Sequence, residues 1–177
     1  PTVSSNNQEG AYIGTKHLID QGCKHIVCLR GPKGVGPADD RLAGFLEATK
    51  GQKMTTKIID CPFQFETAEK ATKKILQDFP TVDGIFASSD ISAAGALKAA
   101  YSLKIDVPNQ LQIVGFDNIS LSEMTMPSLT TIAQDVYKMG AVSTRILIKM
   151  IENLPIEQKA IEIPVELIKR GTTRSGS

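Results

Sequence analysis

Four carboxylates stand where an expected strand ends or an expected helix begins, namely Asp39, Asp40, Asp90 and Asp117. In a parallel sheet such positions gather at one edge, where a metal ion or a polyol could use the carboxylate oxygens. For Asp90 the simpler interpretation is an N-cap, because Asp is one of the residues that helix starts favour. The carboxylates therefore predict a polar site but name no reaction.

Other residue types that perform catalysis are sparse. His17 falls on the apolar side of an expected helix and His25 opens an expected strand, so both are interpreted as structural. The sequence contains neither a Gly-x-Ser-x-Gly elbow nor a Walker loop, and Gly31, Gly34 and Gly36 lack the Gly-x-Gly-x-x-Gly spacing. We expect no catalytic residue, no metal and no cofactor. A sugar-modifying enzyme is the alternative, and it would need a poised nucleophile or base in a cleft.

The composition is that of an ordinary globular chain. Its 177 residues carry 20 Lys plus Arg and 19 Asp plus Glu, a formal charge of +1 that gives no electrostatic reason to bind a polyanion unaided. No apolar run approaches the roughly 18 residues of a membrane helix. Cys23, Cys28 and Cys61 lack metal-site spacing. Together these features predict buried, reduced thiols in a cytoplasmic protein.

Hydrophobic periodicity alternates between helix and strand along most of the chain. Helices are expected at residues 9–21, 38–50, 67–77, 90–103 and 136–152, and strands at 25–29, 57–60, 84–87, 111–116 and 161–168. This order predicts an α/β fold with a doubly wound parallel sheet and ligands beyond the carboxyl ends of its strands. On the last helix an apolar stripe predicts a core or subunit seam; it consists of Met139, Val142, Ile146 and Met150.

Several segments, in order, resemble the lactose-repressor family, whose regulatory core is similar to periplasmic sugar-binding proteins. They are Gly10-Ala-Tyr with His17-Leu-Ile, Gly31-Pro, Arg41-Leu-Ala-Gly-Phe45, Asp83-Gly-Ile-Phe-Ala-Ser-Ser-Asp90, Ala94-Gly-Ala-Leu97, Val107-Pro, Val114-Gly-Phe-Asp-Asn118, Pro127-Ser-Leu-Thr-Thr-Ile132 with Gln134, and Leu167-Ile-Lys-Arg170. The resemblance implies two doubly wound lobes, with the N-terminal lobe incomplete in this chain.

The resemblance also implies a division of the chain between the lobes. Residues 1–22 and 132–163 are expected in the N-terminal lobe, and residues 23–131 and 164–177 in the C-terminal lobe and its tail. The chain would then cross between lobes near Gly22, Ile132 and Pro164, which together form a hinge. The family's helix-turn-helix DNA-binding module and the first half of its N-terminal lobe are expected to precede Pro1.

Five ligand-binding residues follow from the family's sugar contacts, namely Arg41, Phe63, Ser89, Asp117 and Gln134. The resemblance gives Arg41 the role of forking to two hydroxyls, Asp117 that of accepting hydroxyl protons, and Gln134 that of bonding at the lobe crossing. Phe63 would either stack on the sugar or serve the core. Ser89 stands where many members carry Asn. Arg41 and Asp117 could also simply pair with each other.

The expected function is effector sensing in a sugar-responsive transcriptional repressor. The expected ligand is a small sugar, ribose rather than a purine, because Lys33, Val35 and Pro37 do not reproduce the purine-binding pattern. Operator DNA would be bound through the N-terminal module, no membrane would be involved, and residues 42–48 and 94–101 are candidates for a homodimer contact. The alternative is a periplasmic sugar receptor of a transporter, which a signal peptide upstream would distinguish.

Overall fold

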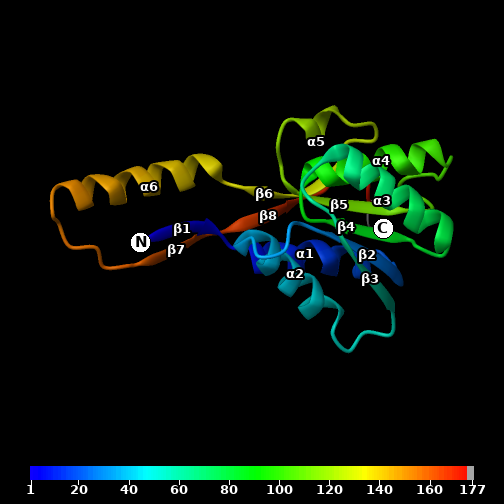
Figure 1. Cartoon of the computed structure of the whole chain (residues 1–177), viewed down its shortest axis with the longest axis horizontal. Helices are drawn as coiled ribbons and strands as arrows, with labels where there is room; N and C mark the ends of the chain where they lie inside the picture. Colours follow the sequence, from blue (N-terminus) through cyan, green and yellow to red (C-terminus); the bar gives the residue numbers. More distant parts are fainter. Residues whose placement is uncertain (175–177) are drawn as a thin grey trace.

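A six-stranded sheet forms the centre of the main body in this computed structural model, which describes residues 1–174 (Figure 1). Its strands are β2 (His25–Arg30), β3 (Thr55–Asp60), β4 (Gly84–Ala87), β5 (Gln112–Asp117), β6 (Thr130–Gln134) and β8 (Val165–Ile168). They lie in the order β3-β2-β4-β5-β6-β8, and all neighbours are parallel except the pair β6–β8. The expected α/β architecture is confirmed.

Helices cover both faces of this sheet. Helices α1 (Asn7–Asp20) and α2 (Gly36–Thr49) pack together on one face, and α3 (Phe65–Asp78) and α4 (Asp90–Ser102) on the other. Every residue of β4 is buried, because this central strand is covered on both sides. Each face has its own apolar core, one built around Ile85 and Ile113 and the other around Phe86 and Phe116.

A smaller part extends from one end of the main body (Figure 1). It contains the parallel strands β1 (Thr2–Ser5) and β7 (Ala160–Ile163) and the helix α6 (Val136–Ile151). The extended segment expected over residues 161–168 is divided at Pro164, since β7 pairs with β1 and β8 joins the large sheet. Strand β1 was not predicted, because it has only four residues, most of them are polar, and they show no strand pattern.

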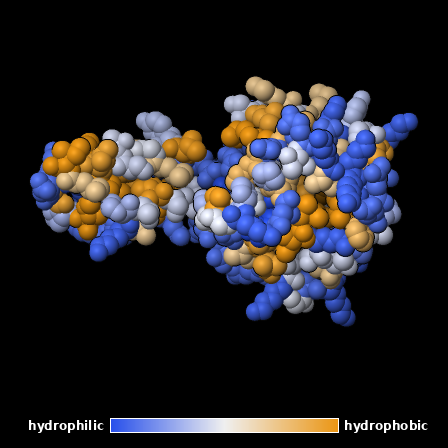
Figure 2. Space-filling view, in the orientation of Figure 1, coloured by the Kyte–Doolittle hydropathy of each residue, from blue (hydrophilic) through white to orange (hydrophobic). Residues whose placement is uncertain are grey.

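Helix α6 does not form the core that its apolar stripe predicted. Among the described residues, no side chain of α6 is fully buried, and Leu147, Met150 and Ile151 are exposed. Figure 2 shows apolar surface over this extension. Within this chain the stripe is therefore a half-covered face, and the seam interpretation stays a prediction.

The expected lobe boundaries need one correction. Residues 1–22 were assigned to the N-terminal lobe, but α1 packs against α2 and the large sheet. Gly10 and Gly14 allow this approach, because an added Cβ would lie 2.8 Å from the Phe116 ring or 3.1 Å from Val114. The chain passes between the two parts next to Asn6, next to Asp135 and at Pro164. Of the expected tail segment 164–177, residues 175–177 lie outside the described part.

A short helix, α5 (Leu121–Met124), lies in the connection between β5 and β6. None of the helices described between residues 1 and 174 has the length and apolar character needed to cross a membrane.

The close approach of α1 and α2 can be tested at Gly44. A Cβ at this position would lie 2.0 Å from the backbone oxygen of Gln8 and 2.8 Å from the backbone nitrogen of Tyr12. We expect Gly44→Ala to lower the free energy of unfolding by about 1–3 kcal/mol, because two backbones must move apart. Chemical denaturation of the whole protein measures the change.

Gly140→Ala is the matched control on α6, where an added Cβ meets nothing within 4 Å. It should raise the free energy of unfolding by about 0.5–1 kcal/mol through helix propensity. Equal stabilisation by both substitutions would contradict the packing of α1 on α2.

Candidate functional site

Arg41 is a buried cation that contacts three separate elements. Its Nε donates to Oδ1 of Asn7, the first residue of α1, at 2.8 Å. Its Nη1 donates to the carbonyl oxygen of Ser88, just after β4, at 2.7 Å and lies 3.1 Å from Oδ1 of Asp117. The guanidinium carbon lies 3.7 Å from the centre of the Phe116 ring. Burial lowers the pKa of Arg41 and Asp117 opposes that shift, so the side chain stays charged.

Asp117 ends β5 and receives two hydrogen bonds on one oxygen. Its Oδ1 accepts from Nη1 of Arg41 and, at 2.6 Å, from Nε2 of Gln134, the last residue of β6. Burial raises the pKa of the Asp117 carboxyl, although the adjacent guanidinium opposes this. The structure thus brings together three of the five expected ligand residues, Arg41, Asp117 and Gln134.

Two groups in this cluster keep hydrogen-bonding capacity. All hydrogen bonds of Arg41 to residues 1–174 come from Nε and Nη1, which leaves the two N–H groups of Nη2. Those of Asp117 to side chains in the same range reach only Oδ1. The backbone of Asp90 also hydrogen-bonds to this carboxylate, but each carboxylate oxygen can accept more than one hydrogen bond. A donor pair beside a charged acceptor is complementary to sugar hydroxyls, because each hydroxyl both donates and accepts.

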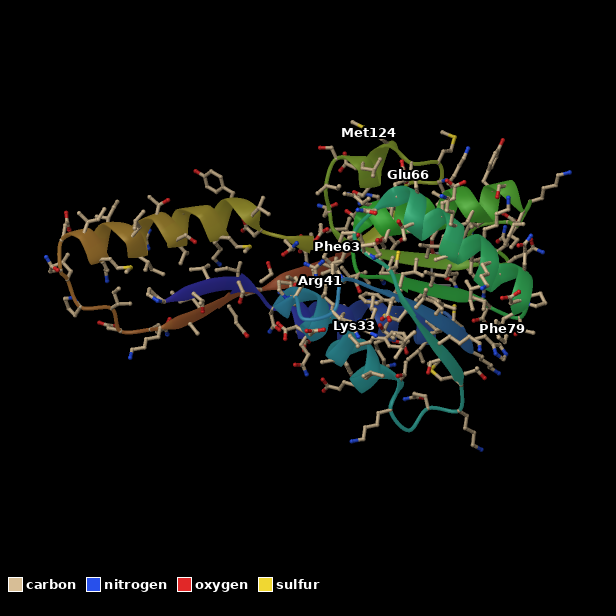
Figure 3. The ribbon with its side chains drawn as sticks, viewed as in Figure 1. Lys33, Arg41, Phe63, Glu66, Phe79 and Met124 are labelled. Carbon is tan, nitrogen blue, oxygen red and sulfur yellow. The ribbon has the colours of Figure 1, made fainter. Side chains whose placement is uncertain are left out.

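A pocket of about 510 Å³ lies next to this cluster, where the main body meets the extension. Gln134 and Asn118 line it from the main body, and Lys138 and Ile163 line it from the smaller part. Figure 3 shows Arg41 at the end of the main body from which the extension leaves. The cluster therefore lies beyond the carboxyl ends of the strands, at the position expected for a ligand of a doubly wound sheet.

Two expected ligand residues have other contacts. The hydroxyl of Ser89 caps α4, since it accepts from the backbone N–H of Ser92 at 3.1 Å and donates to the Ser92 hydroxyl at 3.0 Å. Phe63 is half-buried against the loop after β2, where a Cβ on Gly31 would lie 2.3 Å from its ring. Neither side chain is joined to Arg41 by a hydrogen bond or a cation–π contact within residues 1–174.

Asp90 was interpreted as the N-cap of α4, and that interpretation is wrong. Ser89 takes this position, and the Asp90 side chain turns inward with no exposed surface. Its Oδ1 accepts from the hydroxyl of Thr131 at 2.5 Å, and its Oδ2 accepts from the backbone N–H of Ile119 at 2.9 Å. One carboxylate thereby connects α4, β6 and the loop after β5. Burial raises the pKa of Asp90 to about 6, and these two hydrogen bonds oppose the shift.

Two contributors to the cluster were not predicted from the sequence. Asn7 and Asn118 are polar residues next to chain crossings or turns, and no spacing rule marks them. Asn118 has a φ of +56° and Asp117 a φ of +113°, both in the left-handed region. The only sequence signal is the Asp-Asn pair after a buried strand, because Asn and Asp tolerate this conformation better than other non-glycine residues do.

The remaining reactive residue types have structural roles. His17 is buried and bonds to the hydroxyl of Thr173 at 3.0 Å. Burial raises the pKa of the Cys23 and Cys28 thiols to about 12, and all three cysteines are buried and unpaired with one another. Over residues 1–174 no group of three or more His, Cys, Asp or Glu side chains is arranged to hold a metal ion.

Comparison with known proteins identifies the domain type. The family model of a periplasmic binding protein-like domain matches residues 15–173. The chain is similar to a ribose operon repressor of Halalkalibacterium halodurans, with 49% identity over 176 residues that cover 99% of this chain and 53% of that protein. The chain therefore spans about half the length of the curated relatives it matches.

Solved structures share the fold. A periplasmic binding protein/LacI transcriptional regulator from Alkaliphilus metalliredigens, complexed with D-xylulofuranose, has a TM-score of 0.89 and 32% identity, covering 98% of this chain and 66% of that one. A LacI family transcriptional regulator from Enterococcus faecium with bound ribose has a TM-score of 0.88 and 25% identity, covering 97% and 64%.

Asp90 should make the free energy of unfolding depend on pH. Its pKa rises from 3.8 to about 6 on folding, so the folded state holds the proton more tightly. Its contribution to stability is therefore fully present below pH 3.8 and is lost as the pH rises to about 6. This shift of the Asp90 pKa corresponds to about 3 kcal/mol in the free energy of unfolding. Urea unfolding between pH 4 and 7.5, for the wild type and Asp90→Asn, measures it.

The free energy of unfolding of Asp90→Asn should rise relative to the wild type by up to that amount, about 3 kcal/mol, across this range. Burial lowers the pKa of His17, but this histidine is present in both proteins, so its effect cancels in the difference. Parallel pH curves for the two proteins would show that Asp90 is not the buried titrating group.

Proposed function

This chain belongs to the family of periplasmic binding protein-like domains, and on that premise we propose that it is the effector-binding part of a sugar-responsive transcriptional repressor. The observation that carries the proposal is the buried pair of Arg41 and Asp117, which a hydrogen bond joins to Gln134 in the lining of the pocket. The proposed effector is a small sugar, and ribose is the first candidate because a similar protein is named a ribose operon repressor.

In the proposed complex, Nη2 of Arg41 donates to one or two hydroxyls and Oδ2 of Asp117 accepts a hydroxyl proton. Gln134 adds an amide group at the same edge. The contacts already present fix these side chains before the ligand arrives, so little conformational entropy is lost on binding. Phe63 and Ser89 stay candidates for ligand contact, although Phe63 packs against the loop at Gly31 and Ser89 caps α4.

The proposed site is adjacent to two of the three chain crossings. Asn7, which accepts from Arg41, follows the crossing at Asn6, and Gln134, which donates to Asp117, precedes the crossing at Asp135. A ligand that binds these side chains also contacts the segments that lead to the smaller part. The ligand can thereby bias the relative orientation of the two parts, and in the proposed repressor this changes operator affinity through an N-terminal DNA-binding module.

The alternative of a periplasmic receptor is less well supported, because the similar proteins are named as transcriptional repressors or regulators. We accordingly propose a cytoplasmic location and no catalytic role. Binding of a specific operator by the whole protein, released or strengthened by ribose, supports the repressor. Ribose binding without any DNA binding favours the receptor.

We also propose that the whole protein is a homodimer. Met124 and Met126 are 77% and 93% exposed at and just after α5, and such exposed methionines are typical of contact surfaces. Residues 42–48 and 94–101 were the segments expected to form the dimer contact, and their exposed large apolar side chains are Leu46 and Tyr101. Sedimentation at micromolar concentration should show a dimer that Met124→Lys with Met126→Lys weakens, whereas a wild-type monomer would contradict the proposal.

The ligand assignment predicts large losses of affinity at two positions. A hydrogen bond to a charged group contributes about 1.5–3 kcal/mol, so Arg41→Lys and Asp117→Asn should each weaken ribose binding roughly ten- to a hundredfold. Lysine lacks the second donor nitrogen, and the amide of asparagine lacks the charge. Calorimetric titration of the whole protein with ribose measures both dissociation constants.

Asp20→Asn and Arg145→Lys are matched controls, because both side chains are exposed on helices away from the cluster. They should leave the ribose dissociation constant unchanged. If Arg41→Lys and Asp117→Asn lower only the thermal stability and leave ribose affinity as it was, the two residues merely pair with each other and the assignment is wrong.

A further inference from the structure

The last residue of β5, Asp117, and the first residue of the loop that follows it, Asn118, have a backbone conformation that costs free energy. Both are non-glycine residues with φ in the left-handed region, at +113° and +56°. Such residues cost on the order of 1–3 kcal/mol each and persist only where the surroundings hold them. Since Asn118 lines the pocket and Asp117 belongs to the polar cluster, whatever holds this loop also sets the geometry of the site.

Arg170, which follows β8, contacts this loop and makes no hydrogen bond to Arg41 within the described residues. Its Nη2 donates to Oδ1 of Asn118 at 2.8 Å and to Oε1 of Glu123 at 3.1 Å. Its Nη1 donates to the carbonyl oxygen of Leu129 at 3.0 Å and to the hydroxyl of Ser122 at 3.2 Å. One guanidinium therefore joins the loop, α5 and the start of β6.

The main chain of Arg170 is held equally firmly. Its backbone N–H donates to the hydroxyl of Thr130 at 2.9 Å, and that hydroxyl donates back to the Arg170 carbonyl at 3.2 Å. The guanidinium is consequently aimed from a fixed position on the large sheet. The next residue of the loop, Ile119, donates its backbone N–H to Oδ2 of Asp90 at 2.9 Å.

We propose that Arg170 is a positioning residue for the effector site, and that its guanidinium holds Asn118, and through the backbone Asp117, in the left-handed conformation that presents them to the ligand. This inference rests on the proposed function. The planar guanidinium of Arg170 directs its N–H donors to four acceptors in different directions. The ammonium group of lysine has only three donors on one nitrogen, so lysine cannot replace this arginine. Arg170 itself does not touch the ligand.

The test compares Arg170→Lys with Arg174→Lys in the whole protein. Arg174 is a matched control from the same terminal segment, because its guanidinium also donates to two acceptors, the backbone oxygens of Gln21 and Asn109, away from the site. We expect Arg170→Lys to weaken ribose binding by about tenfold in calorimetric titration, and Arg174→Lys to leave it unchanged. Equal ribose affinity in the wild type and Arg170→Lys would overturn the inference.

A second measurement does not depend on the ligand. Amide hydrogen exchange of residues 117–123 should speed up several-fold in Arg170→Lys and stay at the wild-type rate in Arg174→Lys, because only the first substitution frees the loop. Unchanged exchange in Arg170→Lys would also overturn the inference. If the wild type fails to bind ribose while exchange responds as expected, the ribose assignment fails and the anchoring of the loop by Arg170 stands.

A double-mutant cycle separates positioning from general stability. In an Asn118→Gly background the side-chain anchor is absent and glycine adopts the left-handed conformation at little cost. There Arg170→Lys should have little further effect on ribose affinity, so the two substitutions should be non-additive. Full additivity would show that Arg170 acts without Asn118.

Discussion

The buried guanidinium of Arg41 is the interaction on which the arrangement of the site depends. An uncompensated buried charge would be strongly destabilising, so the surrounding elements must bring acceptors to it. Asn7 from α1, Ser88 after β4 and Asp117 at the end of β5 do so, and Phe116 covers one face of the guanidinium. Correct placement of α1 on the sheet and correct stacking of β4 beside β5 are thus both required for one side chain to be satisfied.

A second set of polar contacts supports this geometry. Asp90 connects α4 to β6 and to the loop after β5, and Arg170 connects the segment after β8 to the same loop. The backbone at Asp117 and Asn118 has positive φ, and this conformation places the Asp117 carboxylate beside Arg41. Polar networks of this kind are costly unless every member is paired, and the dense pairing here is typical of a preorganised binding site.

The alternation of helix and strand could be predicted because buried parallel strands are apolar throughout, and β4 begins and ends at the expected residues. The part of the molecule to which α1 belongs could not be predicted, because an apolar helix face does not indicate which of two cores it packs against. Arg41 came from the family resemblance, whereas Asp117 was also indicated by its place at the end of an apolar strand. Asn7, Asn118 and the inward turn of Asp90 depend on contacts between residues distant in sequence, which no local pattern encodes.

The central claim is that Arg41 and Asp117 use their remaining hydrogen-bonding groups to bind a sugar. A crystal structure of the whole protein with ribose tests it most directly. The account predicts ribose hydroxyls within hydrogen-bond distance of Nη2 of Arg41 and Oδ2 of Asp117, with the Arg41 contacts to Asn7 and Ser88 retained. Ribose bound elsewhere, for example in the groove between α6 and β7, with the cluster around Arg41 unaltered, would contradict it.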